Sequence, residues 1–314
     1  MNGDFSYEET LMIKAAWYYY MENYTQQNIS ELLKISRVRV IRLLEKARQD
    51  GVISFHIRQD SDRRMQVEKE LIARFGLQDV WVVPVNGQVG DLNESLAQAA
   101  AIYISDRLDR NYFVNMGYGD TLSRVLNHLA RRAETPVNVV ALTGGVNHYL
   151  PNAQSSIFNA RLHLIPSPLF LSNPEMVEEI RKEVSVQRIQ QMSREAAMTV
   201  VGIGSMSEDA TIIKNSILTQ TDFLLLTMKG AVGDLLSRFI DKDGNPVESG
   251  LDNRLLSTSL EELKKMNNVI GVAGGRHKAE AIRAALRGNY LDILITDEET
   301  AAMLLNASEA SRSI

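Results

Sequence analysis

The sequence predicts an α/β protein in which a small helical N-terminal domain precedes a large C-terminal domain. Seven short runs rich in β-branched residues lie between residues 80 and 296, and stretches of helical period separate most of them. Such alternation indicates a parallel sheet with helices on both faces, which is a doubly wound fold. Several runs end in glycine, and the first 59 residues show helical patterns instead. A chain of 314 residues is long enough for two domains.

The composition is that of an ordinary globular protein, with 45% apolar and 23% charged residues. The absence of cysteine excludes disulfides, thiol catalysis and thiolate metal sites. The N-terminus "MNGDFSYEET" has neither the basic nor the apolar region of a secretory signal. No apolar run approaches the roughly 20 residues of a membrane span. We therefore expect a cytoplasmic protein.

Charge is distributed unevenly along the chain. The net charge is −5, yet residues 1–59 carry eight Lys/Arg against seven Asp/Glu. Within residues 34–48, six basic residues face Glu45 alone. This segment can attract a polyanion, which the rest of the surface would repel. The alternative is a solvated helix face, which is the usual meaning of a charge run.

Three helices are predicted in the N-terminal domain. The first covers residues 8–22, and the second begins after the N-cap candidate Thr25. The third begins after Ser36, another N-cap candidate, and ends near Asp50, where Gly51 is a C-cap candidate. The alternating "VISFHI" (52–57) predicts a short strand, or wing.

The second and third helices have the apolar spacing of a helix-turn-helix. Ile29, Leu33, Ile35, Val40, Leu43 and Leu44 form the predicted inner face. Lys34 occupies the turn, where glycine is common, and a simple helical bundle shows similar spacing. The basic outward face favours DNA binding in a major groove. The candidate DNA-binding residues are Gln26, Ser36, Arg37, Val38, Arg39, Ile41 and Arg42.

We predict three segments: a helix-turn-helix domain (1–59), a helical connector (60–77) and an α/β effector-binding and oligomerisation domain (78–314). The connector "RRMQVEKELIARFGL" (63–77) carries an apolar stripe that includes Val67 and Leu71. In open α/β sheets, ligands bind outside the carboxyl ends of the strands. The loops after the predicted strands are therefore the candidate site.

Three loops supply most of the candidate effector residues. "MGYGDTL" (116–122) enters a helix and suits a phosphate; the alternative is a tight turn, which explains one of its two glycines better than both. "TGGVN" (143–147) is a second glycine loop, and "AGGRHK" (273–278) ends on a lysine placed for an anion. Asp241, before a DG turn, either binds sugar hydroxyls or caps the turn. The candidates are Gly117, Tyr118, Gly119, Asp120, Thr121, Thr143, Gly144, Gly145, Asp241, Gly274, Gly275 and Lys278.

No catalytic set assembles in the sequence. The five histidines are scattered without metal-ligand spacing, and neither a nucleophile elbow nor a P-loop is present. "GIGSMSED" (202–209) lacks the third glycine of a dinucleotide fingerprint. We expect no cofactor and no metal.

Together, the motifs resemble the SorC family of bacterial transcription regulators. They are, in order, the helix-turn-helix "TQQNISELLKISRVRVIRLLEK", then "GYGDT", "TGG", "VGIG", "KGAVGD", "FIDKDG" and "VAGGRHKAEAI". The resemblance covers almost the whole chain. It implies an N-terminal DNA-binding domain and a C-terminal domain similar to sugar-phosphate isomerases and deaminases. It also implies a homotetramer built as a dimer of dimers.

The resemblance further implies how a sugar or sugar-phosphate effector would lie. Its phosphate would lie near Gly117–Thr121 and Lys278, and its hydroxyls near Thr143–Gly145 and Asp241. Sorbose, or its phosphate, is the expected sugar, and a carbohydrate-catabolism operon the expected target. The related enzymes carry an acid/base Asp–Gly–His after their "GVG" strand, where this chain has "GIGSMSED". The pocket is then retained without the chemistry.

Two alternatives remain at this point. The first is an active sugar-phosphate isomerase or deaminase with an added N-terminal domain. The second is a scaffold whose N-terminal helices bind protein instead of DNA. In the favoured regulator, the "WYYY" helix and the connector are the expected places for subunit contacts, with burial within one protomer as the alternative.

Overall fold

The computed structural model divides the chain into two compact units, residues 1–62 and 63–314. Each unit is described by itself. Most of the expected wing (52–57) lies outside the described residues. The described residues are 7–20, 22, 24–53, 59–84, 92–108, 112–145, 159–207 and 218–306.

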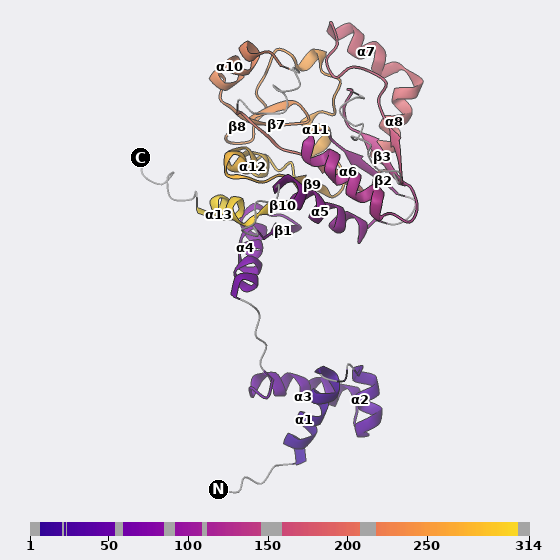
Figure 1. Cartoon of the computed structure of the whole chain (residues 1–314), viewed down its shortest axis with the longest axis vertical. Coiled ribbons are helices and arrows are strands. Elements are labelled where there is room, and N and C mark those ends of the chain that lie inside the picture. Colours follow the sequence, from indigo (N-terminus) through magenta and orange to yellow (C-terminus); the bar gives the residue numbers. More distant parts are fainter. Residues whose placement is uncertain are drawn as a thin grey trace. The chain divides into compact units, whose positions relative to one another are not determined.

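The first unit contains three helices: α1 (Tyr7–Tyr20), α2 (Gln26–Leu33) and α3 (Arg37–Gln49) (Figure 1). Their bounds match the predicted helices to within two residues. Ile29 and Val40 are completely buried where α2 packs against α3, and Ala15 of α1 lies in the same core. The apolar spacing of the sequence therefore becomes the core of this unit.

The second unit is built on a seven-stranded parallel sheet in the order β1-β10-β9-β5-β2-β3-β4. All seven predicted runs are strands of this sheet. The neighbouring inner strands β10, β9 and β5 are buried along their whole length, as expected for a sheet covered on both faces. The strands are β1 (Asp79–Val83), β2 (Phe113–Met116), β3 (Val137–Ala141), β4 (Ala160–His163), β5 (Met198–Val201), β9 (Val269–Val272) and β10 (Ile293–Asp297).

Helices cover both faces of the sheet, which confirms the doubly wound α/β class. Val200 and Val201 are neighbours on β5, yet they belong to two different apolar clusters because successive side chains point to opposite faces. One cluster contains α5 (Leu92–Ser105) and α6 (Asp120–Arg132); the other contains α4 (Gln59–Phe75), α12 (Ala279–Arg287) and α13 (Glu298–Asn306). Helix α8 (Val184–Arg194), which follows α7 (Pro174–Lys182), contacts β2 and β3.

A small antiparallel sheet, β6 (Gly204–Ser205), β7 (Ala231–Leu235) and β8 (Arg238–Asp241), lies beside α12 (Figure 1). Leu236 and Ser237 form the β7–β8 turn, and both have positive φ, as a type I′ turn requires. No helix in the described part of the chain is both long and apolar enough to span a bilayer. The remaining elements are α10 (Gln220–Met228), η2 (Asp252–Arg254), α11 (Leu260–Leu263) and η3 (Arg276–Lys278).

Candidate functional site

The outward side of α3 carries the predicted DNA-binding residues. Val40, Leu43 and Leu44 are buried against α1 and α2, so helical geometry turns the intervening positions toward solvent. Val38 is 59% exposed, a large value for an apolar side chain inside a helix. We call these residues the basic face of α3: Arg37, Val38, Arg39 and Arg42, which are exposed, and Ile41, which is half-buried.

The turn between α2 and α3 is tight although it contains no glycine. Lys34 adopts the left-handed conformation with φ 53°, the region that glycine enters most easily. The Ile35 N–H donates to the Ser30 carbonyl at 3.1 Å, and the Ser30 hydroxyl donates to the Ile35 carbonyl at 2.7 Å. These two bonds hold Lys34 in its conformation, so the turn keeps the helix-turn-helix geometry.

Both helix starts are capped as the sequence predicts. The Thr25 hydroxyl accepts a hydrogen bond from the Asn28 N–H at 3.2 Å, directly before Gln26, the half-buried first residue of α2. The Ser36 hydroxyl accepts from the Arg39 N–H at 3.3 Å. A serine hydroxyl retains its own hydrogen as a donor in this arrangement. Exposed Ser36 therefore offers that donor beside the first turn of α3.

The candidate effector site lies at the carboxyl edge of the seven-stranded sheet. From β2 the chain continues to β3 and β4 on one side, and then returns to β5 on the other side of β2. This reversal is the topological switch point, where ligands bind in open α/β sheets. Three predicted loops meet this edge because they follow β2, β3 and β9, namely residues 117–121, 143–145 and 274–278.

Helix α6 starts at this edge without a side-chain cap. Gly119 is its N-cap residue, with φ 131°, and no side chain accepts a hydrogen bond from the first turn in the described structure. The first N–H groups of a helix lack partners within the helix and carry a partial positive charge. Buried Thr121 belongs to this first turn. The start of α6 is thus suited to an anion.

Two hydrogen bonds hold the side chain of Asp120, the first residue of α6. One carboxylate oxygen accepts from the Asn93 amide at 3.0 Å and from Arg124 Nε at 3.1 Å. Arg124 also donates to Glu94 at 3.0 Å, and the His128 ring lies 2.8 Å from the other Glu94 oxygen. Arg124 thus offsets part of the negative charge that Asp120 would otherwise present to an anionic ligand.

Lys278 and Asp234 form the charged part of the site. Both are partly buried, Lys278 at the end of η3 and Asp234 on β7. Burial raises the pKa of Asp234 to about 6, although the Ser237 N–H and the charge of Lys278 oppose this rise. Burial also lowers the pKa of Lys278, against the opposing charges of Asp234 and Asp120. Perturbed carboxylate and ammonium groups in one place are typical of functional sites.

Asp234 is not among the predicted effector residues, although it is the last residue of the motif "KGAVGD". Its carboxylate accepts from the Ser237 N–H at 3.1 Å, which shapes the β7–β8 turn. The Ser237 hydroxyl in turn lies 2.5 Å from the Tyr118 hydroxyl, so the turn contacts the loop after β2. Gly117 allows this approach, since a Cβ atom there would lie 2.9 Å from Leu236.

Asp241 does not join this group. It lies at the end of β8 opposite the β7–β8 turn. Asp241 is four positions after Ser237, so at about 3.3 Å per strand residue the two are roughly 13 Å apart. Its carboxylate accepts hydrogen bonds from the backbone N–H groups of Asp243 at 2.9 Å and Asn245 at 2.8 Å. The geometry therefore matches the alternative stated above, in which Asp241 caps its own turn.

The glycines of the other two loops serve close packing. The N–H groups of Gly144 and Gly145 donate to the carbonyls of Leu256 and Ser167 at 2.8 and 2.7 Å. Buried Thr143 uses its hydroxyl to donate to the Gly144 carbonyl.

The pair Gly274 and Gly275 packs against buried Asp297. The Gly275 N–H donates to Asp297 at 2.8 Å, and a Cβ atom on Gly274 would lie 2.4 Å from that carboxylate. These glycines position the loops, whereas Lys278 and the start of α6 offer groups to a ligand.

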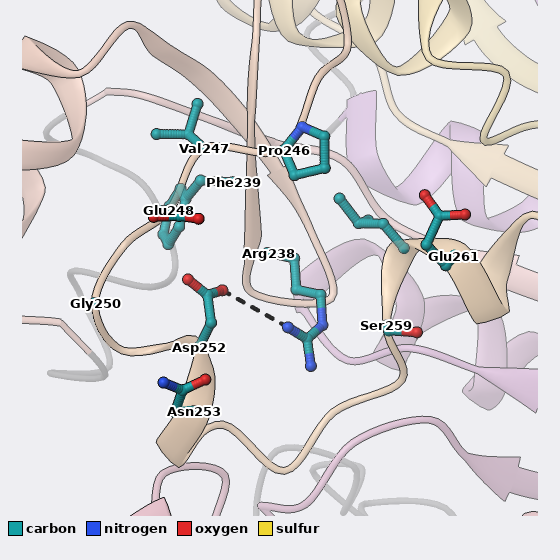
Figure 2. Close-up of a pocket in the computed structure, with 11 residues that line it drawn as sticks. Arg238, Phe239, Pro246, Val247, Glu248, Gly250, Asp252, Asn253, Ser259 and Glu261 are labelled. Carbon is teal, nitrogen blue, oxygen red and sulfur yellow. Dashed lines mark ion pairs between the residues drawn. The ribbon is translucent and has the colours of Figure 1, made fainter.

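A cavity of about 390 Å³ lies away from this edge, beside β8 (Figure 2). Arg238 points across it toward Asp252, and the two charged groups are 3.6 Å apart. The Arg238 guanidinium also donates to the carbonyls of Thr258 at 2.9 Å and Ser257 at 3.1 Å. These bonds fasten β8 to the segment before α11. Among the described residues, no group of His, Asp or Glu is arranged to hold a metal ion.

Comparisons with known proteins give one consistent result. A sequence model of a protein family, described as "Putative sugar-binding domain", matches residues 60–306. The transcriptional regulator LsrR of Klebsiella pneumoniae subsp. pneumoniae is 37% identical over 303 residues, which is 95% of this chain and 93% of that protein. LsrR of Escherichia coli strain K12 is 34% identical over 304 residues, 96% of each chain.

Comparisons with solved structures also find operon regulators. The full-length sorbitol operon regulator SorC from Klebsiella pneumoniae has a TM-score of 0.69 at 26% identity, covering 97% of this chain and all of that chain. A probable sor operon regulator from Shigella flexneri has a TM-score of 0.66 at 25% identity, covering 77% of this chain and 99% of that chain.

Proposed function

Since the chain belongs to the SorC family of transcriptional regulators, we propose that the basic face of α3 binds operator DNA under the control of a sugar-type effector in the second unit. The relatives are named as transcriptional regulators, so the chain is a regulator with a sugar-binding domain and not an enzyme. The residues that contact DNA and effector, the identity of the sugar and the oligomeric state are our proposals.

DNA recognition is assigned to α3. Arg37 and Arg42 contact phosphates or guanine edges in the major groove, because both are exposed on a helix whose apolar side is buried in the core of the unit. Exposed Val38 packs against thymine methyl groups, and Ser36 donates to a phosphate. Gln26 begins the helix that crosses the DNA backbone. The observation that supports this assignment is the exposure of Arg37, Arg39 and Arg42 together on the side of α3 that does not pack into the core.

The effector lies between the start of α6 and Lys278. A phosphate or another anionic group accepts from the first N–H groups of α6 and from the Lys278 ammonium. Asp234 accepts hydrogen bonds from sugar hydroxyls. Asp120 tolerates the anion because Arg124 and Asn93 hold its carboxylate. The single observation that carries this assignment is that Lys278 lies near both Asp234 and Asp120, the first residue of the uncapped helix α6, at the carboxyl edge of the sheet.

Sorbose and its phosphate are the first effectors to test. The structural neighbour named a sorbitol operon regulator is 26% identical, whereas the relatives named LsrR reach 37%. A wider panel of free and phosphorylated sugars is therefore needed. The protein acts as a homotetramer, a dimer of dimers, so that paired α3 helices reach successive major grooves roughly 34 Å apart.

The DNA contacts are tested by titrating a promoter fragment from the chain's own operon with single variants. Arg37→Ala and Arg42→Ala should each weaken DNA binding about tenfold or more. Each should also reduce the slope of log K against log salt concentration by about one unit, because one phosphate contact is lost. Exposed Lys14 on α1 gives the matched control, since Lys14→Ala removes the same charge from the same unit. Equal behaviour of all three variants would contradict the assignment of α3.

The effector assignment is tested by thermal unfolding of the full chain with the sugar panel. A ligand that binds the folded protein raises the midpoint according to its concentration and affinity. Lys278→Gln should abolish the shift produced by a phosphorylated sugar, whereas Lys264→Gln on an exposed site should not. If the Lys278→Gln protein showed the same shift in unfolding midpoint as the wild type, the proposed contact between Lys278 and the anion would be wrong. The oligomer is tested by light scattering, for which we expect four times the 35.2 kDa of the chain.

A further inference from the structure

A second cavity in the residue 63–314 unit has no role in the function proposed above. It encloses about 300 Å³ between α8, the α11 segment and the end of β3. Apolar side chains, among them Leu142, Ile165 and Ile189, line part of it, and polar side chains line the rest. Apolar walls with a few converging polar groups are typical of small-ligand sites, and this volume lies at their lower end.

The charged groups around this cavity are mostly positive. Arg181, Arg194 and Lys265 line it together with one carboxylate, Glu262. That carboxylate is engaged in the cap of α11, where it accepts from the Ser259 N–H and hydroxyl, both at 2.9 Å. The cavity therefore has an excess of positive charge, although the chain as a whole is acidic.

Arg181 provides the most specific sign of a ligand. Its Nε atom is buried and has no hydrogen-bond partner among the residues that the structure describes. Nearly all buried polar groups in proteins are paired, and an unpaired buried donor next to a charge is costly. Arg181 also lies near Arg238, whose pKa is lowered chiefly by burial; Asp252 opposes this shift, and the charge of Arg181 adds to it. An anion in the cavity would offset the charge of Arg181 and give its guanidinium a partner.

We propose that this cavity binds a small organic anion: a phosphate or carboxylate group on a short carbon skeleton. The anionic group bonds to Arg181, with Lys265 and Arg194 at the rim, and the carbon skeleton packs against Leu142 and Ile189. The neighbouring cavity beside β8 is a poor anion site because Glu248, Asp252 and Glu261 line it (Figure 2).

The proposed anion site is separate from the candidate effector site. Its lining includes neither the 117–121 loop nor the 274–278 loop. A hydrogen bond nevertheless connects the two regions, because the Ser257 hydroxyl, which lines the cavity, donates to the carbonyl of Leu236 in the β7–β8 turn at 2.8 Å. The site is thus distinct from the candidate effector site.

Calorimetric titration of the full-length protein tests this proposal. Glycerol 3-phosphate and glycerate are the probes for the phosphate and the carboxylate, and glycerol is the uncharged control. The titration is done in the Lys278→Gln background, which removes the anion contact of the sugar site. Arg181→Gln should weaken the bound probe about tenfold or more, because it removes a charge-assisted hydrogen bond. The control is Lys182→Gln. Lys182 is the adjacent, exposed lysine and donates to Glu179 at 2.8 Å, so its replacement should keep the affinity for the probe within about twofold of the Lys278→Gln protein.

Lys265→Gln is the second variant, so that the test does not depend on the folding of Arg181→Gln. Its matched control is Lys264→Gln, because the Lys264 ammonium lies over the Tyr290 ring and not in the cavity. Two results would overturn the proposal. In one, neither anionic probe binds the Lys278→Gln protein at millimolar concentration. In the other, the cavity variants and their neighbours bind equally well.

Discussion

Replacing Asp234 with asparagine is expected to stabilise the residue 63–314 unit. Burial raises the pKa of this carboxyl from 3.8 to about 6, even with the attraction of Lys278 included. A carboxyl whose folded-state pKa exceeds its unfolded value stabilises the fold while protonated, and this contribution is lost as pH rises through the folded pKa. At pH 7.5 the ionised form therefore costs about 3 kcal/mol at most, from roughly two pKa units. Partial solvent contact reduces this value, so we expect about 1–3 kcal/mol.

Urea unfolding at several pH values measures this effect. The fluorescence of Trp81 on β1 reports the unfolding of the residue 63–314 unit, and Trp17→Phe removes the signal of the other tryptophan. The advantage of Asp234→Asn should fall from about 1–3 kcal/mol at pH 7.5 to about 1 kcal/mol or less at pH 4.5, where the folded wild type is already protonated. Asp243→Asn, at an exposed position, controls for net charge. An asparagine variant that is less stable than wild type by the same amount at both pH values would refute the reasoning.

Two further predictions concern backbone geometry. Lys34→Gly should stabilise the residue 1–62 unit by about 0.5–1 kcal/mol, because glycine adopts φ 53° without the cost of a Cβ atom. Unfolding followed by Trp17 fluorescence in a Trp81→Phe protein measures this change, and a loss of stability would contradict the prediction. Gly144→Ala should destabilise the residue 63–314 unit by about 1–3 kcal/mol, because the new Cβ atom would lie 2.4 Å from the Pro168 carbonyl oxygen. Gly202→Ala is the control: its Cβ atom would have its nearest neighbour at 3.8 Å, so the free energy of unfolding in urea should change little.

The local elements could be predicted because their causes are local. Thr25 and Ser36 cap their helices through bonds to residues three positions later, a spacing that is visible in the sequence. Ile29 and Val40 are buried because their apolar period places them on one helix face. The strands of the parallel sheet were equally evident, since burial on both faces requires nearly continuous apolar runs.

The charged part of the candidate site could be predicted only in part. Lys278 and Asp120 stood out because each follows a glycine loop near a helix start. Asp234 and Asp241 are both carboxylates on one hairpin, and no local signal ranks one above the other. The β7–β8 turn forms at Leu236 and Ser237 without glycine, so the sequence carried no clear sign of which end of the hairpin would meet the loop after β2.

By itself, the sequence determined the helix-turn-helix, the outward direction of its basic face and the parallel strands with their glycine loops. Hydrogen bonds and apolar periods spanning only a few residues specify these features. The tertiary structure alone decided that Asp234 lies near enough to Lys278 for their charges to interact, and that Arg181 lines a second, basic cavity. Strand order and register bring together residues that lie tens of positions apart in the chain, and their proximity depends on the packing of the whole sheet.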